Sequence, residues 1–199
     1  QVIKLSSNIL LVTDIFGNCT ALQPLLQDIA AAGAAVTIVD PYQGGEQSFV
    51  DETAAYQAYS SNGGHDAYAA CVAQALAQPY TLALGFSAGA TALWRGLAAA
   101  DAGQITQAVL FYPGQIHQHL AVRPKLPVQV IFGHSEPHFA VAAICTELSK
   151  KPGITAVQTA CGHGFMNPAS KAFDSAGYQQ CFTRFIQCHI AAAKSNSLA

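Results

Sequence analysis

The chain has 199 residues, of which 51% are hydrophobic and only 10% are charged, and its formal net charge is −2. This length accommodates a substantial core, and we expect a single domain over residues 1–199. No Lys or Arg occurs between Lys4 and Arg95, so the first half lacks the basic stripe of a nucleic-acid-binding surface. No apolar run reaches the ~18 residues that a membrane span needs. We therefore expect neither nucleic-acid binding nor membrane insertion.

The cysteines and the N-terminal segment bear on the compartment. The six cysteines are widely spaced and include no CxxC pair, and a chain of this size needs no disulfides for stability. We expect free thiols packed as small hydrophobic side chains. Residues 1–7 contain one lysine and no long apolar run, unlike a signal peptide. These features predict a cytoplasmic protein.

Short apolar runs alternate with longer amphipathic segments. In chain order, strands are predicted at 9–13, 35–39, 80–84, 108–112, 128–132 and 154–159. Helices are predicted at 20–32, 66–77 (with Asp66 as the cap), 88–100, 141–150 and 170–193. Residues 42–64 are rich in Gly, Ser and Asn, and they predict a loop that borders a pocket.

Strands that are apolar throughout and separated by helices are typical of a parallel sheet covered on both faces. We therefore predict an α/β fold, with a mostly parallel sheet of about six strands and helices on both faces. In such sheets functional residues gather in the loops beyond the carboxyl ends of the strands. The candidate residues below follow predicted strands.

The segment 85–89, Gly-Phe-Ser-Ala-Gly, has the G-x-S-x-G pattern of a nucleophile elbow between a predicted strand and a predicted helix. Its sharp turn strains the serine backbone, and larger side chains two positions away on either side would collide. The turn presents the Ser87 hydroxyl, and the Ala88 N–H at the helix start points to the space where an oxyanion would form. The pattern predicts Ser87 as a nucleophile, and the alternative is a glycine-rich turn with a structural serine.

A nucleophilic serine needs a base and an acid, which follow it in the order acid, then His. His163 lies between two glycines directly after the last predicted strand, so its imidazole has room to reach the elbow. Glu136 is the only carboxylate in the loop after the strand 128–132. We predict His163 as the general base and Glu136 as the acid that orients it. The alternatives are a structural histidine and a solvated loop carboxylate.

Two histidine pairs have spacings that resemble metal ligands. Pro137 lies between His134 and His138 and opposes a helix that would bring both imidazoles to one face. His117 and His119 have too few further partners. We expect no metal and no cofactor.

Four segments together resemble the dienelactone hydrolase family of α/β-hydrolases. They are Asp-Ile-Phe-Gly at 14–17, the elbow at 85–90, Gly-x-x-Glu at 133–136 and Gly-His-Gly-Phe-Met-Asn-Pro at 162–168. They occur in the family's order and span most of the chain. The resemblance implies a minimal α/β-hydrolase fold, a triad of Ser87, Glu136 and His163, and an oxyanion hole formed by the N–H groups of Ile15 and Ala88.

The chain also departs from the family. Dienelactone hydrolases use a cysteine nucleophile, an aspartate in the triad and a glutamate before Ile-Phe-Gly, where this chain has Ser87, Glu136 and Asp14. They hold a substrate carboxylate with arginines, whereas 42–64 has no basic residue and the segment just after His163 has no arginine. The resemblance therefore predicts the fold and the triad, but not dienelactone as substrate.

The expected pocket wall favours an uncharged substrate. Residues 5–94 form much of that wall and contain no Lys or Arg, and an unpaired buried carboxylate would cost several kcal/mol. Arg95 and Arg123 are the cations that would reverse this expectation by reaching the site. The loop 42–64 instead offers aromatic rings, namely Tyr42, Phe49, Tyr56 and Tyr59.

We therefore predict a serine hydrolase that cleaves a small ester, thioester or lactone through an acyl-enzyme intermediate. One alternative is an amidase or peptidase with the same triad. Another is a degenerate hydrolase fold that serves as a binding module. The expected partner is a small-molecule ester, and the weakly charged surface also allows a homodimer.

Overall fold

The chain folds around one sheet of six parallel strands in the order β2-β1-β3-β4-β5-β6. The structure, a computed structural model, describes residues 7–196, so most of the segment used in the signal-peptide argument lies outside the described residues. The predicted α/β fold with a six-stranded parallel sheet is confirmed. The strands are β1 (Ser7–Val12), β2 (Ala34–Val39), β3 (Leu82–Phe86), β4 (Ala108–Phe111), β5 (Val128–Phe132) and β6 (Ile154–Gln158).

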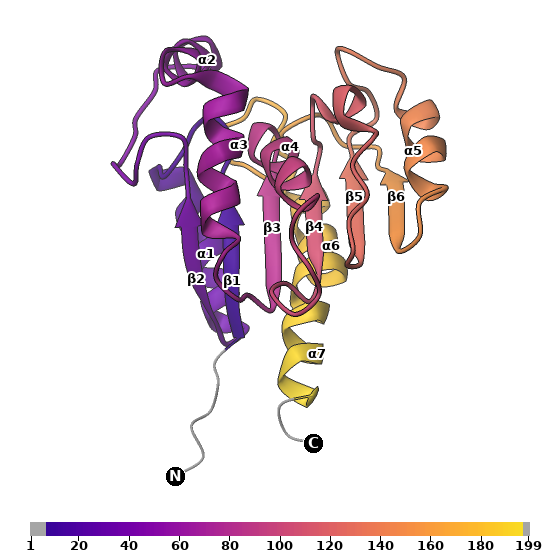
Figure 1. Ribbon diagram of the computed structural model, residues 1–199. Coiled ribbons are helices and arrows are strands. Elements are labelled where there is room, and N and C mark those ends of the chain that lie inside the picture. The colour runs from indigo at the N-terminus through magenta and orange to yellow at the C-terminus, as the bar shows by residue number, and fades with distance from the viewer. Residues whose placement is uncertain (1–6, 197–199) are drawn as a thin grey trace.

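Helices cover both faces of the sheet, with α3, α4 and α5 on one face and α1, α6 and α7 on the other (Figure 1). The helix α2 lies beyond the carboxyl ends of the strands. The bounds are α1 (Gln23–Ala31), α2 (Glu52–Ser61), α3 (Gly64–Ala75), α4 (Ala88–Gly96), α5 (Val141–Ser149), α6 (Ser175–Cys181) and α7 (Cys188–Asn196). Two 3-10 turns, η1 (Thr20–Leu22) and η2 (Ile116–His119), and a π-helical segment, η3 (Phe182–Gln187), complete the list.

Successive side chains of a strand point to opposite faces of the sheet, and this alternation divides the core into two layers. In β1, Leu10 and Val12 pack in the layer that contains Trp94 of α4. Their neighbours Ile9 and Leu11 pack in the other layer, under α1 and the C-terminal helices. All four strand residues are fully buried. A strand buried on both faces must be apolar at every position, which explains the continuous apolar runs in the sequence.

Two predictions near the site were wrong. The strand predicted at 80–84 begins at Leu82 and runs through Phe86, while Tyr80 forms only an isolated bridge to Ile105. The predicted loop 42–64 contains α2, which begins after Asp51. The Asp51 carboxylate accepts the Ala54 N–H at 2.8 Å, and a carboxylate in this position stabilises a helix start.

Two helix starts also differ from the prediction. The helix expected to begin at Asp66 begins at Gly64, after Gly63 with φ 92°. Asp66 therefore lies in the first turn and does not cap the helix. The helix expected from residue 170 begins at Ser175, because the Asp174 carboxylate accepts the Gly177 N–H and caps it there.

The structure bears on the predictions about membrane insertion and cysteine pairing. Within residues 7–196, no helix is long and apolar enough to cross a membrane. All six cysteines are free thiols in the structure. The cytoplasmic location stays a prediction.

The chain winds in opposite directions from β1 to β2 and from β3 to β6, so β1 and β3 flank a switch point in the sheet. Ligands bind at such points, outside the carboxyl ends of the strands. The turn after β1 and the start of α4 meet there in close backbone contact. A Cβ atom on Gly89 would lie 2.1 Å from the Thr13 carbonyl oxygen and 2.6 Å from that of Val12. Only glycine allows α4 to approach β1 this closely.

This contact makes Gly89→Ala a test of the fold. Alanine is normally better than glycine within a helix by about 1 kcal/mol, but here the added methyl group overlaps backbone that cannot move alone. We expect urea unfolding to show a loss of about 2–4 kcal/mol. Gly45→Ala is the control, because its new Cβ would meet nothing nearer than 3.5 Å, and it should change stability by less than about 0.5 kcal/mol. A Gly89→Ala variant as stable as the wild type would contradict the packing.

Candidate active site

The turn between β3 and α4 has the geometry of a nucleophile elbow. Ser87 has φ 53° and ψ −117°, a conformation that costs free energy for a residue with a side chain. Its N–H donates to the Phe111 carbonyl at 2.9 Å, which anchors the turn to the sheet. A Cβ on Gly85 would lie 2.7 Å from the Cα of Ala90. The sequence prediction of glycines that allow a tight turn is therefore right at the atomic level.

The loops after β5 and β6 are held against each other. The His134 N–H donates to the Cys161 carbonyl at 2.7 Å, and its Nδ1 lies 3.0 Å from the same oxygen. A Cβ on Gly133 would lie 2.9 Å from that oxygen. Because the two backbones are in contact, Glu136 on one loop reaches His163 on the other.

Ser87, His163 and Glu136 form a continuous chain of hydrogen bonds. Ser87 Oγ lies 2.8 Å from His163 Nε2, and His163 Nδ1 lies 2.7 Å from Glu136 Oε2. The Glu136 side chain is fully buried, whereas that of His163 is 29% exposed. The Tyr112 ring packs against the imidazole with 5.0 Å between ring centroids. The structure thus brings together the three side chains that the sequence selected.

The two predicted oxyanion-hole residues lie beside Ser87. Ile15 and Ala88 line the same cavity, and within the described residues neither N–H donates to another backbone or side-chain group. Ala88 is the first residue of α4, where the helix dipole adds positive potential. Both N–H groups are therefore available to a developing negative charge.

Tyr42 fixes the Ile15 peptide, a contact that the sequence did not predict. Its hydroxyl donates to the Ile15 carbonyl at 2.5 Å. Burial raises the pKa of Tyr42 to about 12, with smaller contributions from the Asp14 and Asp40 charges, so the phenol remains a donor at neutral pH. The sequence gives only one weak indication of this contact, which is that Tyr42 comes two residues after the aspartate at the end of a predicted strand.

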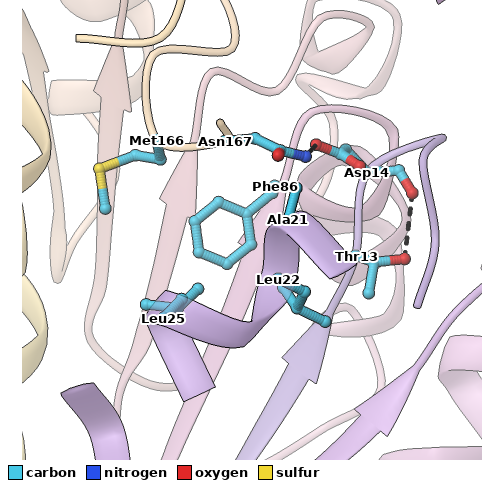
Figure 2. A pocket seen from close by; sticks show the side chains of 8 residues that line it. All are labelled: Thr13, Asp14, Ala21, Leu22, Leu25, Phe86, Met166 and Asn167. Atoms are coloured by element: carbon cyan, nitrogen blue, oxygen red, sulfur yellow. Dashed lines mark hydrogen bonds between the residues drawn. The ribbon is translucent and has the colours of Figure 1, made fainter. Parts of the chain in front are cut away.

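Asp14 holds the turn after β1 in place. The Phe16 N–H donates to its Oδ1 at 2.9 Å. Asn167 Nδ2 donates to its Oδ2 at 2.6 Å, the bond that is drawn in Figure 2. Burial raises the pKa of the Asp14 carboxyl, although both hydrogen bonds oppose that shift. Because its two oxygens are occupied in this way, Asp14 ties the turn to the loop after β6 and makes no hydrogen bond to Ser87.

A small cavity lies next to this carboxyl, between Phe86, Met166 and the start of α1 (Figure 2). Its volume is about 20 Å³, which is room for roughly one water molecule. It is too small for a substrate.

The cavity above Ser87 is larger, at about 250 Å³. Helix α2 contributes one side of it, and the loops after β4, β5 and β6 contribute the other. Its size suits a small molecule. It is lined by Ile15, Glu52, Tyr56, His65, Ser87, Ala88, Gly114, Gln115, Glu136, Pro137, His138 and His163.

Of the four aromatic rings expected in the wall, only Tyr56 lines this cavity. Tyr59 is buried in the core, with its hydroxyl 2.9 Å from His65 Nδ1. Tyr42 bonds Ile15, and Phe49 packs on Tyr42 with 5.5 Å between ring centroids. The prediction failed for Tyr59 because α2 turns this residue into the core, and for Tyr42 and Phe49 because they pack beside the Ile15 peptide before α2 begins.

The sequence left open whether Arg95 or Arg123 reaches the site, and the structure places neither of them there. Arg95 pairs with Asp66 at 2.9 Å and donates to the His65 carbonyl at 3.3 Å. Arg123 lines a different pocket, together with Lys150 and Lys151. Neither lines the cavity above Ser87.

The histidine pairs give no metal site in the described part of the chain. The rings of His117 and His138 lie 6.2 Å apart, a proximity that the sequence did not predict. Among residues 7–196, however, no group of three or more His, Cys, Asp or Glu side chains is arranged to hold a metal ion.

Most of the chain is similar to one known protein family. The model of the dienelactone hydrolase family matches residues 4–191. No curated protein sequence matches the chain.

Solved structures with a similar fold are distant in sequence. A putative dienelactone hydrolase from Klebsiella pneumoniae subsp. pneumoniae MGH 78578 superposes with a TM-score of 0.74 at 16% identity, covering 96% of this chain and 89% of its own. A dienelactone hydrolase-like promiscuous phosphotriesterase from metagenomic libraries gives 0.68 at 16% identity, covering 94% and 86%. A cold-adapted esterase from an Arctic intertidal metagenomic library gives 0.54 at 17% identity, covering 90% and 82%. At these identities the likeness establishes the fold.

The hydrogen bond between His163 and Glu136 suggests a test of whether Glu136 is the acid that orients the base. We expect Glu136→Gln to lower kcat by about 10²–10⁴-fold with little change in KM, because an amide cannot stabilise the imidazolium. Steady-state kinetics on a chromogenic ester measures both constants. Asp174→Asn is the matched control, because that carboxylate caps α6 and should affect stability rather than kcat. An unchanged kcat in Glu136→Gln would mean that another group orients the base.

Proposed function

Because the chain belongs to the dienelactone hydrolase family, and is therefore an α/β-hydrolase enzyme that acts on esters, we propose that Ser87 is its nucleophile. The substrate in this proposal is a small carboxylic ester, thioester or lactone, cleaved through an acyl-enzyme intermediate. The observation that supports it best is the chain of hydrogen bonds from Ser87 through His163 to Glu136. That chain also argues against a binding module with a disabled triad.

The proposed reaction has two stages. His163 Nε2 takes the proton of the Ser87 hydroxyl as Oγ attacks the carbonyl carbon, and the N–H groups of Ile15 and Ala88 stabilise the resulting oxyanion. The imidazolium then gives its proton to the departing alcohol, which leaves an ester on Ser87. Water attacks this ester with His163 again as the base, and the acid product is released. The buried Glu136 carboxylate stabilises the imidazolium in both stages.

The lining supports a preference against anionic substrates. Among residues 7–196, the lining contains the carboxylates of Glu52 and Glu136 but no Lys or Arg. A substrate carboxylate bound there would lack the cationic partner that offsets the loss of its water. The arginines that hold the carboxylate in the dienelactone hydrolases have no counterpart among the described residues that line this cavity.

The nucleophile is tested by Ser87→Ala. We expect loss of nearly all ester hydrolysis and of labelling by a fluorophosphonate probe, with the label on wild-type protein mapped to Ser87 by mass spectrometry. Stability should change by less than about 1 kcal/mol, because the hydroxyl contributes little packing. Ser87→Cys should retain a nucleophile that reacts with iodoacetamide, since His163 would lower the pKa of the new thiol. Undiminished turnover by Ser87→Ala would reject the proposal.

Substrate charge is tested with a panel of p-nitrophenyl acyl esters and an anionic dienelactone. We expect kcat/KM for neutral, short- to medium-chain acyl esters to exceed that for the lactone by about tenfold or more, which corresponds to about 1.4 kcal/mol. Efficient turnover of the lactone that is lost in Arg95→Ala or Arg123→Ala would show that a cation reaches the site after all.

A further inference from the structure

Charge is distributed unevenly between the two ends of the sheet. Before Arg95, the described part of the chain contains no Lys or Arg, and four of its carboxylates (Asp40, Glu46, Asp51 and Glu52) lie in the connection from β2 into the first turn of α2, at the catalytic end. Four cations lie at the opposite end, just before β5 and β6: Arg123, Lys125, Lys150 and Lys151, of which Lys150 pairs with Glu147 at 2.6 Å. Such a field draws cations toward the acidic end.

Glu52 carries this negative charge into the cavity above Ser87. It lines the cavity from the first turn of α2, and within residues 7–196 its carboxylate has no ion pair. Its field reaches Asp14, whose pKa is raised mainly by burial and also by the Glu52 charge. The other carboxylate of the lining, Glu136, is bound to His163. Lys171, in the loop after β6, is not part of the lining.

Tyr56 follows Glu52 by one helical turn and lines the same cavity. The residue is 54% exposed, so the ring is accessible to a ligand. A carboxylate beside an accessible aromatic ring is a combination that binds ammonium groups, by ion pairing and by cation–π attraction. A neutral substrate would gain neither interaction, and an anionic one would be repelled.

We infer that this enzyme selects esters that carry a positively charged ammonium group, which Glu52 and Tyr56 bind while Ser87 attacks the carbonyl. The inference rests on the proposed ester hydrolysis and names its substrate class. The ammonium group can belong to the alcohol or to the acyl part, and the chemistry of recognition is the same in both cases.

The test compares each cationic ester with a neutral ester of the same shape. Acetylcholine is paired with 3,3-dimethylbutyl acetate, and betaine ethyl ester with ethyl 3,3-dimethylbutanoate, each kcat/KM being divided by the rate of uncatalysed alkaline hydrolysis. At low salt and pH 8, above the ordinary pKa of histidine, we expect the wild type to favour at least one cationic ester by about fivefold or more. The pair that shows the preference identifies the part of the ester that carries the charge. In 0.5 M salt, a concentration at which exposed charges are screened, the preference should shrink.

Glu52→Gln should bring the ratio of cationic to neutral ester close to one, and it should weaken competitive inhibition by tetramethylammonium. Glu46→Gln is the matched control, because it removes the same charge from the same connection but lies outside the lining; it should change the ratio by less than about twofold. The inference would be overturned if the neutral esters were hydrolysed as well as both cationic ones, or if Glu52→Gln did not change the ratio. Either result would leave ester hydrolysis itself standing. A wild-type protein that hydrolyses none of the four esters, nor any p-nitrophenyl ester, would instead reject the proposed function itself.

Discussion

The close packing of α4 against the end of β1 is the constraint on which the rest of the site depends. Gly89 lets the helix meet the Thr13 carbonyl without an intervening side chain. That approach places the Ala88 N–H next to the turn that carries Ile15, so that both line one cavity with the elbow. It also forces the chain to turn sharply at Ser87, whose strained φ and ψ are held by the hydrogen bond to Phe111. The strain is thus supported by the sheet itself.

Contacts between loops that are far apart in the sequence complete the site. Asp14 and Asn167 are 153 positions apart, yet their hydrogen bond ties the turn after β1 to the loop after β6. The loop after β5 is tied to the same loop through His134 and Cys161. The loops that carry His163 and Glu136 are therefore fixed by neighbouring loops, while the turn that carries Ser87 is fixed by the end of β4. Such support keeps the candidate side chains within hydrogen-bonding distance without a ligand.

The departures from the dienelactone hydrolase pattern form a consistent set. The longer Glu136 side chain still reaches the imidazole, at 2.7 Å. Asp14 uses both carboxyl oxygens to hold neighbouring groups and makes no hydrogen bond to Ser87. The cavity is lined by the Glu52 carboxylate, which has no ion pair within residues 7–196, where a family substrate would need a cation. As we propose, the same scaffold thus supports a different nucleophile and a substrate of the opposite charge.

The sequence by itself determined the sheet, the elbow and the order of the three catalytic candidates, because buried parallel strands are apolar throughout and the elbow needs glycines at fixed spacing. It did not reveal α2, whose cap at Asp51 lies among residues typical of loops. Consequently it could not separate Tyr56, which lines the cavity, from Tyr59, which is buried in the core. The sequence also could not show that Arg95 pairs with Asp66, or that Glu52 lines the cavity without an ion pair among residues 7–196. These outcomes depend on which residues distant in the chain become neighbours, and only tertiary packing decides that.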